Sequence, residues 1–220
     1  GAEPPVFAHI PLILNPDGSK MSKRDAGAGL QWYQDEGFLP EAVDNYLALL
    51  GWSPKDDREK LNIEEITRLF DFDHLNRSNA RFDLEKCSWL NGQHIAALQP
   101  EEFLSRAQAF TGDAPPAAVA LTQPRIQRFS EITEWLAPIL NDEHPLEPEV
   151  AAKLASKPQT ADLLRSLTAR LAQSAEWQAE DIKLAITETA DAQEVKPGAL
   201  MFPLRVTATG TPQGTDLMPT

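Results

Sequence analysis

Hydrophobic residues recur along most of this chain at the spacing of amphipathic helices, and one stretch near the amino terminus alternates as a strand does. In that stretch, residues 6–14, every second residue from Val6 to Leu14 is apolar. Pro11 lacks a backbone donor, which favours an edge position in a sheet. The next residues, 15–18 (NPDG), suit a type I turn. We therefore predict an edge strand that ends in a tight turn.

The hydrophobic pattern then changes to the helical period. A short helix is expected from Leu30 to Glu36, stopped by Gly37. Residues 40–51 form the clearest helix, because proline suits its first turn and Gly51 its C-terminal cap. One apolar stripe runs along this helix: Ala42, Val43, Tyr46, Leu47 and Leu50.

Two further helices are predicted from their start signals. Asn62 and Glu65 have the spacing of a capping box, which predicts a helix start at residue 62. Asp83 is expected to cap another helix directly after Phe82. The Asn-Gly pair at residues 91 and 92 is expected to end that helix.

Beyond Pro100 every periodic segment has a helical pattern. Its apolar stripes are Phe103, Leu104, Ala107 and Phe110; Ile126, Phe129, Ile132, Thr133 and Leu136, in a helix opened by Pro124; Leu163, Leu164, Leu167 and Leu171; and Ile182, Ala185, Ile186 and Thr189. The expected fold class is mainly α, with a small α/β unit over residues 1–98 and an all-α helical bundle over residues 99–209. Residues 210–220 have no periodicity and are expected to be a truncated tail.

Composition narrows the class of protein. Hydrophobic residues make up 42% of the 220, as in globular proteins, and no apolar run approaches the roughly 20 residues that cross a bilayer. Cys87 is the only cysteine, which excludes an internal disulfide framework and fits a reducing compartment. The amino terminus has no signal-peptide pattern. We predict a soluble, cytoplasmic protein. Its scattered histidines have no ligand spacing, so no metal site is expected.

The net charge of −13 means that any contact with nucleic acid needs a small, local basic patch. Residues 15–27, which we call the basic loop, offer one. They place Lys20, Lys23 and Arg24 among small residues that would let the loop close over a ligand. Lysine is a compact charge on a flexible stem and suits phosphates. The loop therefore predicts phosphate binding, and a merely solvated run of charge is the alternative.

Residues 20–24, KMSKR, resemble the KMSKS signature of class I aminoacyl-tRNA synthetases. Their context, HIPLILNPDGSKMSKRDAGAGLQWYQDEGFLPEAVDNYLALLGW, is similar to bacterial-type glutamyl-tRNA synthetase, whose members commonly have arginine in place of the final serine. RFDLEKCSWLNGQHI resembles the stem-contact region of that family, and KPGALMFPLRVTATG the end of its first anticodon-binding domain. The three blocks are collinear and cover essentially the whole chain.

The resemblance implies a function for each part. Lys20, Met21, Ser22, Lys23 and Arg24 would bind ATP, and Lys23 would stabilise charge while the glutamate carboxylate attacks the α-phosphate. The part up to residue 98 would be the stem-contact fold, and residues 99–209 the anticodon-binding domain. The full-length enzyme would join glutamate to tRNA(Glu) with ATP and Mg²⁺, as a cytoplasmic monomer.

Two parts of the family pattern are missing. A nucleotide-binding Rossmann domain with a HIGH signature would precede this segment, and a second helical anticodon domain would follow it. We therefore expect a middle piece of a longer enzyme, which alone binds no cofactor tightly and forms no glutamyl-adenylate. ATP–pyrophosphate exchange above background would refute that expectation.

Two groups of residues are candidates for contact with tRNA. Arg77 and Arg81 lie among Asn and Ser side chains that can bond phosphate and ribose, although a structured surface loop is the alternative. Gln123, Arg125 and Arg128 lie at a predicted helix start which faces the anticodon in the family. Some members have an arginine aligned with Gln123 that rejects the glutamine tRNA. Glutamine there would suit an enzyme that charges both tRNA(Glu) and tRNA(Gln).

Two other functions stay open at this point. A free-standing, non-catalytic RNA-binding module could have this fold, and the length of the gene product would separate it from an enzyme. A helical protein-interaction module would fit the acidity of the chain. Such a module would show no salt-dependent affinity for tRNA, whereas phosphate contacts weaken steeply with salt.

Overall fold

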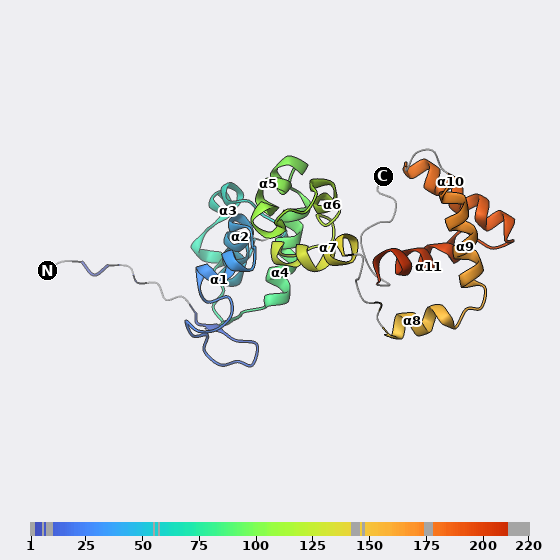
Figure 1. Cartoon of the computed structure of the whole chain (residues 1–220). Coiled ribbons are helices and arrows are strands. Elements are labelled where there is room, and N and C mark those ends of the chain that lie inside the picture. Colours follow the sequence, from blue (N-terminus) through green and yellow to red (C-terminus); the bar gives the residue numbers. More distant parts are fainter. Residues whose placement is uncertain are drawn as a thin grey trace. The chain divides into compact units, whose positions relative to one another are not determined.

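The computed structural model describes residues 3–5, 7, 11–54, 56, 58–141, 146, 148–173 and 178–210. Within these residues the fold is mainly helical, with one small two-stranded sheet, as predicted (Figure 1). The chain divides into two compact units, residues 1–112 with 123–132 and residues 113–122 with 133–220. The boundary expected at residue 98 separates two RNA-binding functions, the stem contact and the anticodon contact. It therefore stays a prediction. The tail over residues 211–220 lies outside the described residues.

The sheet joins two short strands that are far apart in the sequence. Strand β1 (Ile13–Leu14) pairs in parallel with β2 (Ala80–Arg81). The strand predicted over residues 6–14 is therefore right only at its end, since residues 7, 11 and 12 are not in a strand and residues 6 and 8–10 lie outside the described residues. The ladder stops at residue 13 because the backbone N–H of Leu12 donates to the side-chain Oδ1 of Asn79 instead.

The predicted turn after β1 is confirmed. The backbone N–H of Gly18 donates to the carbonyl oxygen of Asn15 at 2.9 Å. Gly18 has φ +88, a left-handed conformation that glycine adopts at no steric cost.

The helices of the first unit enclose more than one cluster of buried hydrophobic residues. They are α1 (Leu30–Asp35), α2 (Pro40–Gly51), α3 (Ile63–Leu69), η1 (Phe72–His74), α4 (Leu84–Ala96), α5 (Pro100–Thr111) and η2 (Phe129–Glu131). Helix α2 packs against α3 and α4. One of these, which we call the core cluster, consists of Tyr33, Phe38, Val43, Tyr46, Phe82, Cys87 and Leu90.

The starts of α1 to α4 and the extent of α2 were predicted correctly, but the capping role of Gly51 and the end of α4 were wrong. The capping box between Asn62 and Glu65 is complete, and Asp83 accepts a hydrogen bond from the backbone of Lys86 at 3.0 Å. Helix α2, however, runs through Gly51 to an extended Trp52, so that Gly51 is not a cap.

Helix α4 continues past the Asn-Gly pair to Ala96 because both residues serve packing there. The side chain of Asn91 is fully buried, and its Oδ1 accepts the backbone N–H of Leu39 at 2.8 Å. Gly92 lies against Gln127, whose Cγ would be 3.3 Å from an added Cβ. The Asn-Gly pair, which is typical of turns, therefore serves helix packing here and does not end the helix.

A buried asparagine, Asn45, links α2 to the segment before α3 and to α4. Its Oδ1 accepts the backbone N–H of Leu61 at 2.9 Å and lies 3.0 Å from Nε2 of His94. Since this oxygen can only accept, Nε2 of His94 carries the proton. Asn45, which the stripe omitted, is fully buried, whereas Leu47, which the stripe included, is 46% exposed.

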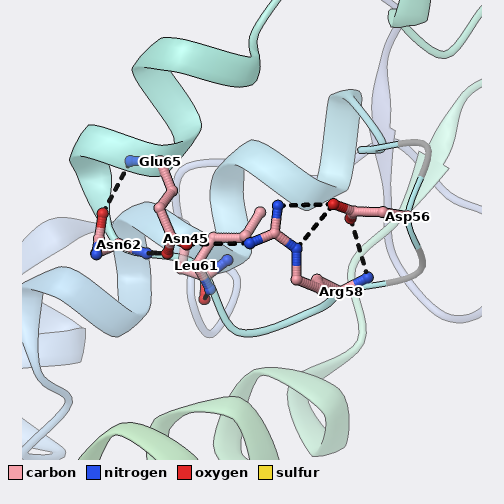
Figure 2. A network of polar contacts seen from close by, with 6 residues as sticks. All are labelled: Asn45, Asp56, Arg58, Leu61, Asn62 and Glu65. Carbon is pink, nitrogen blue, oxygen red and sulfur yellow. Dashed lines mark hydrogen bonds and ion pairs between the residues drawn. The ribbon is translucent and has the colours of Figure 1, made fainter.

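Figure 2 shows the surrounding network of polar contacts. Arg58 bridges Asp56 and Glu65, with Nη1 at 3.0 Å from Oε1 of Glu65. Glu65 in turn closes the capping box of α3 on Asn62. The start of α3 is therefore fixed next to the Asn45 contacts on α2.

The remaining helices are α6 (Pro116–Ala120), α7 (Ile132–Leu140), α8 (Pro148–Ala155), α9 (Thr160–Leu171), α10 (Ala179–Ala192) and α11 (Gly198–Thr209). Helices α9, α10 and α11 pack on one another (Figure 1). The predicted stripes of α9 and α10 bury Leu163, Leu167, Ala185, Ile186 and Thr189. Among the described residues, no helix has both the length and the apolar character needed to cross a membrane.

The helix predicted to open at Pro124 was wrong at its start. Residues 124–128 are not helical, and the regular structure begins at η2 and α7. The entry stays extended, with Arg128 at φ −142, because the backbone N–H of Phe129 donates to the carbonyl oxygen of Gly37 and that of Gln127 to Glu131.

The burial of His94 predicts a pH-dependent stability. Burial, helped by the charge of Lys60 and opposed by Glu41, lowers the pKa of His94 below its ordinary value. In the unfolded chain the pKa of histidine is about 6.5, so that the unfolded chain binds the proton at a higher pH than the folded chain does. We expect the free energy of unfolding to decrease as the pH drops below about 6.5, and this decrease to be smaller in His94→Gln. Urea unfolding at several pH values measures both, and parallel pH profiles of the two proteins would contradict the prediction.

Candidate nucleotide and nucleic-acid interface

The basic loop leaves β1, turns and returns beside it. The backbone N–H of Met21 donates to the carbonyl oxygen of Ile13 at 3.1 Å, and Lys20 forms an antiparallel bridge with Leu14. The side chain of Met21 packs against the core cluster of the first unit. The loop is therefore attached to the body of the unit both by backbone pairing and by an apolar side chain.

A carboxylate inside the loop holds its two halves together. Oδ2 of Asp25 accepts the backbone N–H of Ser22 at 2.7 Å and Nδ2 of Asn15 at 3.0 Å. These bonds, the one from Ser22 first, favour the ionised form and lower the pKa of Asp25 below its ordinary value. Asn15 was predicted only as a turn residue, and no role was predicted for Asp25, although Asp and Asn often bond nearby backbone groups.

The cationic side chains of the loop face solvent. Lys20, Lys23 and Arg24 are exposed, and no residue in the described part of the chain forms an ion pair or side-chain hydrogen bond with them. Ser22 is exposed between them, and its Oγ accepts the backbone N–H of Arg24 at 3.3 Å. The loop thus presents three unneutralised charges on a folded backbone, an arrangement suited to a polyanion.

A pocket of about 580 Å³ opens beside these charges. Lys20, Ser22 and Lys23 line it together with four apolar side chains that are at least partly exposed: Leu12, Ile13, Leu30 and Leu47. A ligand that combines a phosphate with an apolar or aromatic part matches this lining. The pocket also accounts for the exposure of Leu47.

The segment from residue 79 to 83 connects the basic loop to the body of the first unit. The backbone N–H of Ala80 donates to Leu12 and that of Phe82 to Leu14, at 3.1 and 2.8 Å. At the end of the segment, the backbone N–H of Asp83 donates to the hydroxyl of Tyr46 at 2.7 Å. One stretch of chain therefore supports the loop and starts α4.

Gly27 closes the loop against the aromatic ring of Phe82. Its φ of +77 lies in the left-handed region, and an added Cβ would be only 2.3 Å from Cζ of Phe82. Phe82 itself is buried and packs edge-to-face on Tyr46, with ring centroids 5.5 Å apart. Only glycine fits at this position, for both its backbone conformation and its lack of a side chain.

The two arginines expected to contact RNA differ in their surroundings. Arg77 is exposed, with no ion pair or side-chain hydrogen bond to a described residue. Arg81 donates from Nη1 to the carbonyl oxygen of Pro16 at 3.0 Å. Arg81 thus lies on the basic loop, while Arg77 is available to a ligand.

The second predicted group lies in the non-helical entry to η2. Nε2 of Gln123 donates to the carbonyl oxygens of Ile95 and Leu98, at 3.1 and 2.9 Å. These contacts satisfy carbonyl groups at the end of α4. Arg125 is exposed in the same turn.

Arg128 has acidic neighbours that reasoning from the sequence did not foresee. Its guanidinium pairs with Glu36 at 2.6 Å and with Glu131 at 3.0 Å. Glu36 lies 92 positions earlier in the chain, so no local pattern could have indicated it.

In the described residues, no group of three or more His, Cys, Asp or Glu side chains could hold a metal ion.

Two family models match the chain in succession. Residues 1–89 match the model described as "tRNA synthetases class I (E and Q), catalytic domain". Residues 89–220 match the model described as "Anticodon binding domain". Together they cover the whole chain, and the basic loop lies within the first.

Curated relatives agree with these matches. A glutamate–tRNA ligase from Akkermansia muciniphila is 46% identical over 99% of this chain and 51% of its own length. One from Methylacidiphilum infernorum is 36% identical over 100% of this chain and 52% of its own length. A crystal structure of a glutamate tRNA ligase from Elizabethkingia meningosepticum has a TM-score of 0.80 and 29% identity over 98% of this chain and 48% of its own. This chain spans about half the length of the relatives it matches.

Glycine at position 27 provides a test of how the loop is seated. We expect Gly27→Ala to lower the free energy of unfolding by at least about 2 kcal/mol. The alanine would have to adopt a left-handed backbone conformation, and its Cβ would overlap with the ring of Phe82. Gly29→Ala is the matched control: φ at Gly29 is −116 and an added Cβ would meet no atom within 4 Å. Its effect should stay below about 1 kcal/mol, because alanine is only a somewhat poorer N-cap for α1 than glycine. Urea unfolding measures both variants, and equal effects would contradict the close packing of Gly27 on Phe82.

Proposed function

Because this chain belongs to the glutamate–tRNA ligase family and matches the end of its catalytic domain together with its anticodon-binding domain, we propose that it supplies the phosphate-binding loop and the RNA-binding body of an enzyme that joins glutamate to tRNA(Glu). The observation that carries the proposal is the set of exposed, unneutralised cations on the basic loop, inside the catalytic-domain match. The complete enzyme would act as a monomer on glutamate and ATP, with Mg²⁺.

The chemistry proposed for the loop is charge stabilisation. An oxygen of the glutamate carboxylate attacks the α-phosphorus of ATP, the bond between the α- and β-phosphates breaks, and pyrophosphate leaves. Negative charge grows on the phosphate oxygens in this step, and a lysine ammonium placed beside them lowers the barrier. We assign this to Lys23, and the binding of the outer phosphates to Lys20 and Arg24. A ribose hydroxyl of the tRNA end then attacks the activated carbonyl carbon and releases AMP.

The loop lines only one side of such a site. The pocket beside it is open and mostly apolar, so the adenosine and glutamate would need further protein surface. We therefore propose that this chain alone binds ATP weakly and forms no glutamyl-adenylate.

The RNA-binding part of the proposal concerns two surfaces. Arg77, with the neighbouring side chains Ser78 and Asn79, is proposed to contact the tRNA backbone from the stem-contact part, which ends near residue 98. Arg125 is proposed to meet the anticodon side, at the start of the part over residues 99–209. Gln123 and Arg128 would shape that turn through their contacts with α4 and with Glu36.

The choice between tRNA(Glu) and tRNA(Gln) stays a prediction. The amide nitrogen of Gln123 is engaged with two carbonyl groups, and its amide oxygen is the group left to read a base. An enzyme containing this chain is expected to charge both tRNAs. Complete rejection of the glutamine tRNA in a charging assay would end the idea.

Binding of tRNA by this chain should depend on salt and on Arg77. We expect the affinity for tRNA(Glu) to fall by on the order of tenfold or more between about 50 and 200 mM salt, since each phosphate contact releases counterions. Arg77→Ala should reduce the salt slope by about one unit. Arg165→Ala is the control with the same change in net charge, because Arg165 is already paired with Asp162. Fluorescence titrations at several salt concentrations measure the slopes, and affinity without salt dependence would favour a protein-interaction module instead.

A further inference from the structure

Two polar side-chain contacts hold the basic loop, in addition to the pairing of Met21 and the packing of Gly27 on Phe82. Between Gly18 and Leu30 there is no helix or strand, and three of the side chains in this stretch are cationic. Like charges close together favour an expanded loop. The contacts that keep it folded must therefore be found among its own polar groups and its neighbours.

The first point is the carboxylate of Asp25. One oxygen, Oδ2, accepts both the backbone N–H of Ser22 and the side-chain amide of Asn15. The backbone N–H of Asp25 donates to the carbonyl oxygen of Ser22 at 3.1 Å, which closes a turn around Lys23 and Arg24. Because this carboxylate is half-buried and ionised, its hydrogen bonds are charge-assisted and stronger than those of a neutral acceptor.

The second point is the guanidinium of Arg81, which holds the other end of the loop. Its Nη1 donates to the carbonyl oxygen of Pro16, one residue after Asn15. Arg81 is itself in β2, opposite Leu14 of β1, so that its backbone is fixed with respect to the loop entry. The loop entry is thus held from outside by Arg81, and the turn around Lys23 is held to that entry by Asp25.

We infer that Asp25 and Arg81 are positioning residues for Lys23: Arg81 fixes the turn at Pro16, and Asp25 ties the turn around Lys23 to it through Asn15. The inference rests on the proposed function, because it assigns a purpose to the position of Lys23. Neither residue touches the reacting atoms. Both residues restrict the conformations of the loop, which lowers the entropy cost of placing the ammonium group of Lys23 beside the substrate.

Kinetics of an active enzyme test the inference. The vehicle is a chimera in which residues 1–220 replace the matching half of the Akkermansia muciniphila ligase. We expect Asp25→Ala and Arg81→Ala to lower kcat/KM for ATP by about 10- to 100-fold, as small misplacements of catalytic groups do. The KM for tRNA should change less than about twofold in Asp25→Ala. Asp25→Asn and Arg81→Lys, which keep an acceptor or a donor in place, should restore most of the activity.

A double substitution separates positioning from general damage to the fold. If Asp25 acts through Lys23, then Asp25→Ala has almost no further effect on kcat/KM in a chimera that already contains Lys23→Ala. Asp44→Ala is the control for charge, because Asp44 is exposed on α2 and forms no ion pair or side-chain hydrogen bond with a described residue. Additive losses in the double variant, or an equal loss in Asp44→Ala, would overturn the inference.

Hydrogen exchange on the chain itself keeps the inference testable without an active chimera. The backbone amide of Ser22 should exchange more slowly than that of Lys23 in the unsubstituted chain, and should lose this protection in Asp25→Ala but not in Asp44→Ala. An unprotected Ser22 amide in the unsubstituted chain would overturn the inference. If the unsubstituted chimera does not charge tRNA while Ser22 is protected as described, the proposed function fails and the hold of Asp25 on the loop stands.

Discussion

The contact between Phe82 and Gly27 is the constraint on which the candidate site depends. The buried ring of Phe82 packs on Tyr46 in the core and leaves no space for a side chain at Gly27. The backbone of Phe82 bonds to Leu14 at the entry of the basic loop. A single core residue therefore fixes the exit and the entry of the loop, and the cations between them are presented from a defined base.

Although the chain is acidic, the cations of its basic loop are not neutralised by described residues. Five arginines away from the loop form ion pairs with carboxylates: Arg58, Arg106, Arg128, Arg165 and Arg170. Lys20, Lys23, Arg24 and Arg77 have no such pair with any described residue. Because screening limits charge effects to about 10 Å at ordinary salt, local pairing matters more for binding than the net charge of −13.

Local signals predicted the parts of the structure that depend on neighbouring residues. The capping box at Asn62, the cap at Asp83 and the turn at Gly18 were all found from sequence spacing. The errors arose where distant residues decide: Asn91 continues α4 because Leu39 uses its side chain, and the entry to η2 stays extended because Phe129 bonds to Gly37. For the same reason the sequence indicated the cations of the loop but not the Arg81 contact that holds it.

We propose that this chain provides a working loop and RNA-binding body to a glutamate–tRNA ligase. The most direct measurement is the rate at which the chimera with the Akkermansia muciniphila ligase attaches glutamate to tRNA(Glu), compared with the unaltered relative. We expect a rate within about tenfold of the relative, which corresponds to a difference of about 1.4 kcal/mol in the activation barrier. A folded chimera that binds tRNA(Glu) but attaches no glutamate would contradict it.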